Sequence, residues 1–233
     1  MSARPDEAPR HRLHGRRRGK ALRSHHRGLM AEALPGLAVS PADCADPARL
    51  FSRPMRALAL EVGFGGGEHL AARAQEDPDV GILGCEPFEN GVAKLLAEVE
   101  AHDIDNVRVH VGDAGAIVDA LPEASLSRAD VFYPDPWPKR RQRKRRFVSD
   151  DMLARLARAL APGAPLRFAT DIDDYAGWTL ARVLRSRDFD WPAESPADWT
   201  APYPGWPGTR YEAKALAAGR APVYLTFVRR AAA

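Results

Sequence analysis

One carboxylate of this chain, Asp135, lies between two prolines and is followed at once by a strongly basic run. The segment reads Tyr-Pro-Asp-Pro-Trp-Pro-Lys, and seven of the eight residues from Lys139 to Arg146 are Lys or Arg. The prolines restrict the backbone, so we expect the carboxylate to be held in one place. The cations repel one another, and a phosphate-bearing partner such as nucleic acid would relieve that repulsion. The pattern indicates a catalytic carboxylate beside a polyanion-binding strip; the alternative is a solvated charged loop.

Positive charge is concentrated in two stretches of the chain. The second stretch, Arg10 to Arg27, holds eight Lys or Arg residues and no acid. Together the two stretches contain 15 of the 34 cations, which leaves 19 cations against 31 acids and a formal charge of about −12 on the remainder. An acidic body with two basic strips is typical of a protein that binds phosphates at chosen places.

A glycine-rich turn, Glu-Val-Gly-Phe-Gly-Gly-Gly-Glu, begins at Glu61 and follows the first expected strand. Its glycines, Gly63, Gly65 and Gly67, let the backbone approach a nucleotide-like ligand closely. The dinucleotide fingerprint would need a glycine at the position of Glu68, and an acid there suits a cationic ligand better than a pyrophosphate. The alternative is a purely structural strand-to-helix connection.

Three acids are placed at the carboxyl ends of three consecutive expected strands: Glu61, Glu86 and Asp113. Glu86 comes 23 residues after Gly63, about where an acid binds ribose hydroxyls in related folds. Because parallel strands end at one edge of a sheet, these acids should converge, and no phosphate-binding lysine accompanies them. S-adenosylmethionine carries a sulfonium, an ammonium, a ribose and an adenine but no phosphate, so it fits such a pocket.

Short apolar runs alternate with helical patterns, which predicts an α/β fold with a parallel sheet and helices on both faces. Buried strands are expected at 57–62, 80–85, 107–111, 129–133 and 166–170, with a late strand at 223–228. Helices are expected at 68–74, 90–102, 114–120, 150–160 and 174–187, and residues 191–207 as an ordered loop. We expect residues 1–28 to be a flexible basic arm and residues 29–233 to be one catalytic domain.

Five segments of the chain resemble the bacterial tRNA (guanine-N7-)-methyltransferase family. They are EVGFGGGEHL, GCEPFENGVAKLL, PDPWPK with the basic run, ATDIDDYA and TRYEAKALAAGRAPVYLTF, and the resemblance covers about residues 15–229. It implies a Rossmann-like class I adenosylmethionine-dependent methyltransferase fold, mostly parallel with a late antiparallel strand. It also implies methyl transfer from S-adenosylmethionine to N7 of a guanine in the variable loop of tRNA.

The resemblance assigns roles residue by residue. The matching acids imply cofactor contacts at Glu61, Glu86, Asp113 and Asp135, with Asp135 as the catalytic residue. Substrate contacts are implied at Lys139, Asp171, Thr209, Arg210, Tyr211 and Glu212, and RNA contacts at Arg141, Gln142, Arg143, Lys144, Arg145 and Arg146. Many relatives have histidines at positions 142 and 143 and Phe at 211, so the resemblance implies phosphate binding there but no particular base contact.

Three residue assignments have alternatives, and so does the function, for which two other classes of protein are considered. Asp171 could be the N-cap of the following helix, the segment from Thr209 to Glu212 an ordinary turn with a salt bridge, and Trp137 a packing residue that stacks on no base. An adenosylmethionine enzyme acting on a protein or small molecule would explain the pocket but not the basic strip. A noncatalytic RNA-binding protein would explain the strip but not the set of acids.

Other features of the sequence bear on the location of the protein and on metal binding. No apolar signal region or membrane-length run is present, and Cys44 and Cys85 fit no metal spacing, so we expect a cytoplasmic protein without a metal. The histidines His25, His26 and His102 have no partners at metal-ligand spacing. We expect no membrane contact and no obligate protein partner, and either a monomer or a homodimer.

Overall fold

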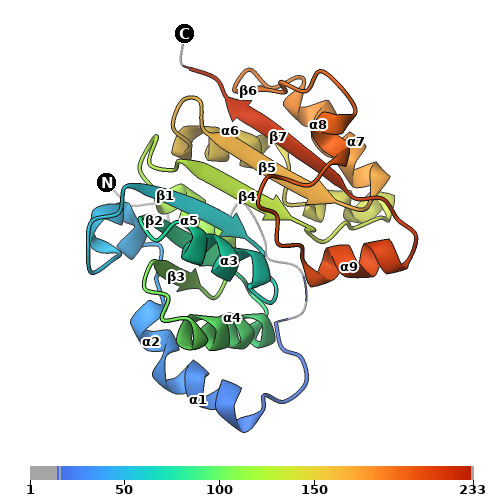
Figure 1. Ribbon diagram of the computed structural model, residues 1–233. Coiled ribbons are helices and arrows are strands. Elements are labelled where there is room, and N and C mark those ends of the chain that lie inside the picture. The colour runs from blue at the N-terminus through green and yellow to red at the C-terminus, as the bar shows by residue number, and fades with distance from the viewer. Residues whose placement is uncertain (1–14, 16, 232–233) are drawn as a thin grey trace, which may run out of the picture.

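Seven strands form one sheet in the order β3-β2-β1-β4-β5-β7-β6 in the computed structural model, which describes Gly15 and residues 17–231 (Figure 1). The strands are β1 Ala57–Val62, β2 Val80–Cys85, β3 Val107–His110, β4 Arg128–Phe132, β5 Pro165–Thr170, β6 Phe189–Asp190 and β7 Val223–Arg229. Strands β1 to β5 pair in parallel, whereas β7 is antiparallel to β5 and β6. The expected mostly parallel sheet with a late antiparallel strand is therefore confirmed.

Helices cover both faces of the sheet (Figure 1). The α-helices are α1 Ser24–Glu32, α2 Leu34–Leu37, α3 Glu68–Glu76, α4 Glu89–Ala101, α5 Ala114–Ala120, α6 Asp150–Ala159, α7 Asp173–Val183, α8 Ala197–Thr200 and α9 Arg210–Ala217. Short 3-10 helices are η1 Asp43–Ala45, η2 Pro47–Arg49 and η3 Arg140–Arg145. In the described part of the chain, none of these helices has the length and apolar character that a membrane span requires.

The strand side chains divide between two cores because successive residues of a strand point to opposite faces. On β2, Leu83 and Cys85 belong to the core that includes α5, α6 and α7, whereas Ile82 belongs to the core of α1, α3 and α4. Helix α6 is capped at its N-terminus by Ser149, whose hydroxyl accepts a hydrogen bond from the Met152 backbone at 3.1 Å. Local capping, and strands whose side chains are buried on both faces, together explain why these segments form a three-layer α/β domain.

The chain reverses its direction of progress across the sheet at β1. It proceeds outward from β1 through β2 to the edge strand β3, and then returns to β4 on the other side of β1. The connections after β1 and β4 therefore diverge at the carboxyl end of the sheet. Such a switch point leaves a crevice where open α/β sheets bind ligands.

Most expected elements are confirmed within a few residues, but α1, α2 and the 3-10 helices were not expected, and three further segments differ. A two-residue strand, β6, was not expected, and the segment expected as a loop at 191–207 contains α8. The segment from Thr209 to Glu212 is not an ordinary turn, because it begins helix α9 with a capping box.

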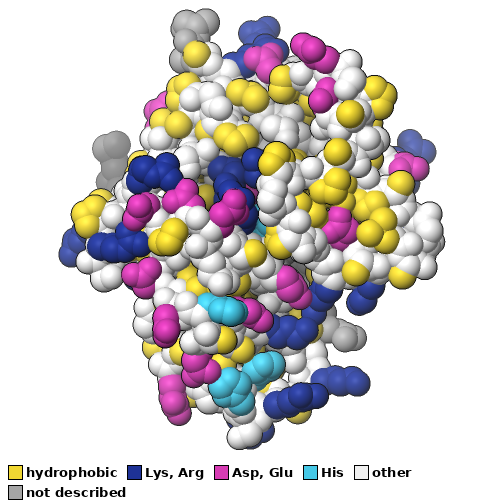
Figure 2. All heavy atoms as spheres, viewed as in Figure 1, with side chains coloured by type: hydrophobic (Ala, Val, Ile, Leu, Met, Phe, Trp, Pro, Cys, Tyr) yellow, Lys and Arg dark blue, Asp and Glu magenta, His cyan; other side chains and the backbone are white. Residues whose placement is uncertain are grey.

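The basic N-terminal stretch packs on the domain in its described part. Helix α1 crosses the expected boundary at residue 28, and ahead of it Arg18 pairs with Glu89 while the Gly19 amide donates to Asn90 at 2.7 Å. Figure 2 shows Lys, Arg and His side chains gathered at the end of the molecule that α1 occupies. The part of this basic stretch formed by residues 10–14 and 16 lies outside the described residues.

Candidate active site

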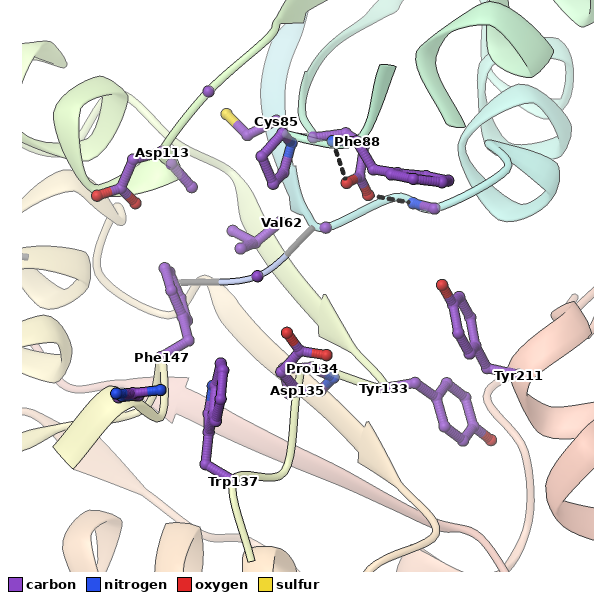
Figure 3. A pocket seen from close by; sticks show the side chains of 18 residues that line it. Val62, Cys85, Phe88, Asp113, Tyr133, Pro134, Asp135, Trp137, Phe147 and Tyr211 are labelled. Carbon is purple, nitrogen blue, oxygen red and sulfur yellow. Dashed lines mark hydrogen bonds between the residues drawn. The ribbon is translucent and has the colours of Figure 1, made fainter. Parts of the chain in front are cut away.

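A pocket of about 340 Å³ opens at the carboxyl ends of β1, β2, β3 and β4. Figure 3 shows Asp113 toward one end, Tyr211 toward the other and Asp135 between them. The lining consists of Gly15, Val62, Gly63, Gly65, Cys85, Glu86, Pro87, Phe88, Gly112, Asp113, Ala114, Tyr133, Pro134, Asp135, Trp137, Arg145, Phe147 and Tyr211. The pocket therefore occupies the crevice that the strand order creates.

The glycine turn forms one wall of the pocket, and its backbone needs glycine. Gly63 and Gly65 have φ values of 71° and 60°, in the left-handed region that other residues rarely adopt. Helix α4 approaches the turn so closely that a Cβ on Gly91 would lie 2.0 Å from the Gly65 carbonyl oxygen. The purely structural alternative accounts for the turn's shape but not for its position in the pocket wall.

Glu86 joins the end of β2 to the glycine turn. One carboxylate oxygen accepts a hydrogen bond from the Gly65 amide at 2.7 Å, and the other accepts one from the Phe88 amide at 2.9 Å (Figure 3). Burial raises the pKa of Glu86, although the two amides and the positive charge of Arg210 act in the opposite direction. The carboxylate is thus fixed in the pocket wall at the strand end where it was expected.

Asp113 and Asp135 complete the acidic lining. Asp113 caps helix α5, and its side chain accepts a hydrogen bond from the Gly115 amide at 3.0 Å. Asp135 lies at the exposed mouth, where partial burial by the pocket walls raises its pKa. A Cβ on Gly15 would be 3.3 Å from an Asp135 carboxylate oxygen, so the N-terminal segment passes close to this acid.

The loop that carries Asp135 has an unusual backbone. Tyr133 and Trp137 have φ values of 49° and 42°, and non-glycine residues seldom occupy this region. The guanidinium of Arg145 lies 4.9 Å from the centre of the Trp137 ring. This cation–π contact supports the packing interpretation of Trp137, and the ring also lines the pocket.

Helix α9 covers the pocket from the other side. Thr209 is its N-cap, and Tyr211 lines the pocket beside the glycine turn. Asp171 does not cap a helix, because the N-cap of α7 is Ile172. The Asp171 carboxylate instead accepts a hydrogen bond from Arg220 at 2.6 Å.

The basic run forms helix η3 beside the pocket mouth, and its residues differ in their surroundings. Exposed side chains are those of Lys139, Arg140, Arg141 and Lys144, whereas Gln142, Arg143 and Arg145 are half-buried. Arg143 pairs with Asp174 at 2.6 Å. Arg146 is 1% exposed and lies between the rings of Tyr175 and Trp178, so its position differs from the solvent-facing strip that the sequence suggested.

Comparison with known proteins assigns the chain to a family. A family model described as "Putative methyltransferase" matches residues 55–225. The tRNA (guanine-N(7)-)-methyltransferase of Brucella anthropi is 53% identical over 93% of this chain and 94% of its own length. The protein of that name from Chelativorans sp. is 50% identical over 98% of this chain and 100% of its own. The chain belongs to the tRNA (guanine-N(7)-)-methyltransferase family.

Solved structures support the fold of this methyltransferase. The 16S rRNA methyltransferase KamB has a TM-score of 0.52 at 15% identity, with 76% of this chain and 89% of that chain covered. The [4+2]-cyclase SpnF has the same TM-score at 15% identity, with coverage of 82% and 80%. The chain has the expected Rossmann-like class I adenosylmethionine-dependent methyltransferase fold.

Glu61 is the one acid of the expected cofactor set that does not line the methyltransferase's pocket. It is 4% exposed, and its carboxylate is 2.7 Å from Nδ1 of His69. One potential ligand atom from each of Glu61, His69 and Asp130 lies within 4.8 Å of the other two, which is close enough for the three residues to share a metal ion. However, Asp130 already pairs with Arg128 at 2.8 Å, and the positive charge of that arginine disfavours a cation there.

Several residues near the site were not singled out from the sequence. Tyr133 and Phe147 line the pocket, and His69 holds Glu61. Trp206, in the loop ahead of α9, and Tyr224, on β7, both donate hydrogen bonds to Glu212. Tyr133 and Phe147 flank the Asp135 segment and could have been found by proximity, whereas the last two carry no local signal.

Proposed function

We propose that the acidic pocket is the cofactor site at which this methyltransferase transfers a methyl group from S-adenosylmethionine to N7 of a guanine in tRNA. The observation that carries the proposal is the lining itself: Glu86, Asp113 and Asp135 converge there, and Arg145 is the only Lys or Arg among the described lining residues. A sulfonium and an ammonium are favoured by such carboxylates, whereas a pyrophosphate would be repelled. The glycine turn allows close backbone approach by the ligand.

The bound cofactor would supply the methyl group, and the protein would supply position and charge. Guanine N7 already has an in-plane lone pair, so no proton must leave before attack and the main task is orientation. Methylation makes the base cationic. The Asp135 carboxylate, at the pocket mouth, would stabilise that developing charge and could accept hydrogen bonds from the base.

The surface beside the mouth supports RNA as the substrate. Lys139, Arg140, Arg141 and Lys144 are exposed on or next to η3, close to the loop that carries Asp135. Phosphate binding there would orient tRNA without reading its sequence. We leave Arg146 out of the proposed contacts, since its guanidinium is buried. An enzyme acting on a small molecule would have no use for this strip.

We assign Tyr211 and Arg210 to the substrate side, on the helix that faces the glycine turn. We further propose that the modified guanine lies in the variable loop, and that the enzyme works in the cytoplasm, where reducing conditions keep Cys44 and Cys85 as thiols.

The test is incubation of the protein with labelled S-adenosylmethionine and unmodified tRNA, followed by mapping of the methylated base. We expect label at N7 of one guanine in wild type. The Asp135→Ala variant should keep its fold and its tRNA affinity but lose transfer. Label at another atom, or full transfer to a small molecule or protein without tRNA, would refute the proposed substrate.

A further inference from the structure

Glu212 is buried in front of the pocket, and both of its carboxylate oxygens are already used. It is 6% exposed. One oxygen accepts hydrogen bonds from the Trp206 indole at 2.6 Å and from the Thr209 amide at 3.2 Å, and the other accepts one from the Tyr224 hydroxyl. These three donors take most of the roughly four acceptor sites of the carboxylate, so little capacity is left for a base or another ligand.

The two residues just ahead of Glu212 lie against the glycine turn of the pocket. A Cβ on Gly65 would lie 3.0 Å from the Tyr211 ring and 3.7 Å from the Arg210 guanidinium, so both side chains lie against the glycine turn. Arg210 also donates a hydrogen bond to the Tyr211 hydroxyl at 3.3 Å, and its charge offsets part of the rise that burial causes in the pKa of Glu86. The first turn of α9 therefore touches the wall of the cofactor pocket.

The groups that hold Glu212 belong to a cluster of packed aromatic rings. The rings of Trp206 and Tyr224 have centres 5.9 Å apart, and Tyr203 lies 5.6 Å from each of them. Tyr224 is on β7, so the cluster joins α9 to the sheet. Tyr224 and Glu212 also raise the pKa of Tyr133, after the larger effect of burial, so the cluster reaches the pocket wall next to Asp135.

We propose that Glu212 is a positioning residue for the methyl-transfer reaction. Its carboxylate, fixed by Trp206 and Tyr224, holds the first turn of α9 in place. Glu212 then acts on the substrate and cofactor only through Arg210 and Tyr211, which meet the glycine turn. The family resemblance implies a direct substrate contact at Glu212, and the buried geometry assigns that contact to its neighbours. This inference rests on the proposed function of the pocket.

A double-mutant comparison separates positioning from direct contact, because a residue that acts through others loses its effect when they are removed. Glu212→Gln keeps the size of the side chain but changes its hydrogen bonds. In the otherwise native enzyme it should lower kcat/KM for tRNA by about tenfold or more. With Arg210 and Tyr211 both replaced by alanine, the same change should lower kcat/KM by less than about twofold. An equal loss in both backgrounds would overturn the inference while leaving the proposed function intact.

Two further variants guard the comparison. Tyr224→Phe removes one donor to Glu212, and it takes the place of Glu212→Gln in the double-mutant comparison if the Glu212→Gln variant fails to fold. Its effect on kcat/KM should likewise be lost when Arg210 and Tyr211 are replaced by alanine. Tyr203→Phe is the matched control, since the Tyr203 hydroxyl donates to the carbonyls of Phe168 and Leu225, and any change that it causes in kcat/KM should be equal in the two backgrounds. If the alanine pair alone kept wild-type kcat/KM, the substrate-side assignment in the proposed function would fail, and the inference with it.

Discussion

Replacing Arg146 tests whether the basic run serves the fold as well as RNA binding. The side chain donates from Nε to the Pro136 carbonyl at 2.8 Å and from Nη1 to the Asp174 carbonyl at 3.3 Å, and it pairs with the Asp174 carboxylate. The Tyr175 and Trp178 rings lie 4.8 and 5.0 Å from the guanidinium carbon. We expect Arg146→Ala to destabilise the protein strongly.

The magnitude follows from the groups that lose their partners. A carbonyl left unsatisfied in the interior costs about 1–3 kcal/mol, and each cation–π contact contributes about 0.5–2 kcal/mol. Asp174 adds little, because its side chain is 45% exposed and water replaces the lost partner. We expect about 3–5 kcal/mol in the free energy of unfolding, or a Tm lower by roughly 6–20 °C for a domain of this size.

The pH dependence of stability gives an independent check. The hydrogen bond from Arg146 lowers the pKa of Asp174, so in wild type this pair stabilises the fold at neutral pH. That contribution is lost as the pH falls through the lowered pKa of the folded state. Arg146→Ala should therefore lose less stability on acidification than wild type does, which a series of thermal melts between neutral pH and pH of about 3 would show.

Lys144→Ala is the matched control for this prediction, because Lys144 is exposed in the same run. It should leave Tm unchanged and reduce the slope of log tRNA affinity against log salt by about 0.7–0.9. Arg146→Ala, measured below its Tm, should leave that slope unchanged. The reasoning is refuted if Arg146→Ala melts like wild type and shows the reduced slope.

Three further outcomes are expected from the proposed site. Glu86→Ala should weaken adenosylmethionine binding by about 1–3 kcal/mol in calorimetry, with an unchanged affinity counting against the ribose assignment. Asp135→Asn should lower kcat far more than tRNA affinity, and a wild-type kcat would remove this carboxylate from the mechanism. Burial raises the pKa of Glu86 and of Asp135, and protonation removes the negative charge that a cationic ligand needs. On acidification, cofactor affinity should therefore begin to fall at a pH above the ordinary titration range of these acids. A fall confined to the ordinary range would contradict this.

The fold was predictable because its signals are local. The strands at 57–62 and 80–85 have the expected bounds, since each is a mostly apolar run that ends in a turn. The strand β6 has only two residues, and it exists because Phe189 and Asp190 pair with the end of β7. A pairing that depends on the position of another strand leaves no pattern in its own sequence.

The site was predictable where the sheet imposes it. Glu86 and Asp113 follow parallel strands, so the topology brings them to one edge whatever their side chains do. Glu61 lies one residue before its strand ends, and that single position turns its side chain away from the pocket toward His69. The role of Glu212 depends on Trp206 and Tyr224, whose contacts exist only in the folded chain.

The basic run shows why charge density alone could not assign roles. Arg143 lies in the last turn of helix η3, and Arg146 is the extended residue that follows the helix. Both side chains reach Asp174 at the start of α7. Arg146 also holds the Pro136 carbonyl, next to Asp135. The inward Arg146 thus fixes the loop that carries the proposed catalytic acid, and the exposed cations of the run remain for phosphate.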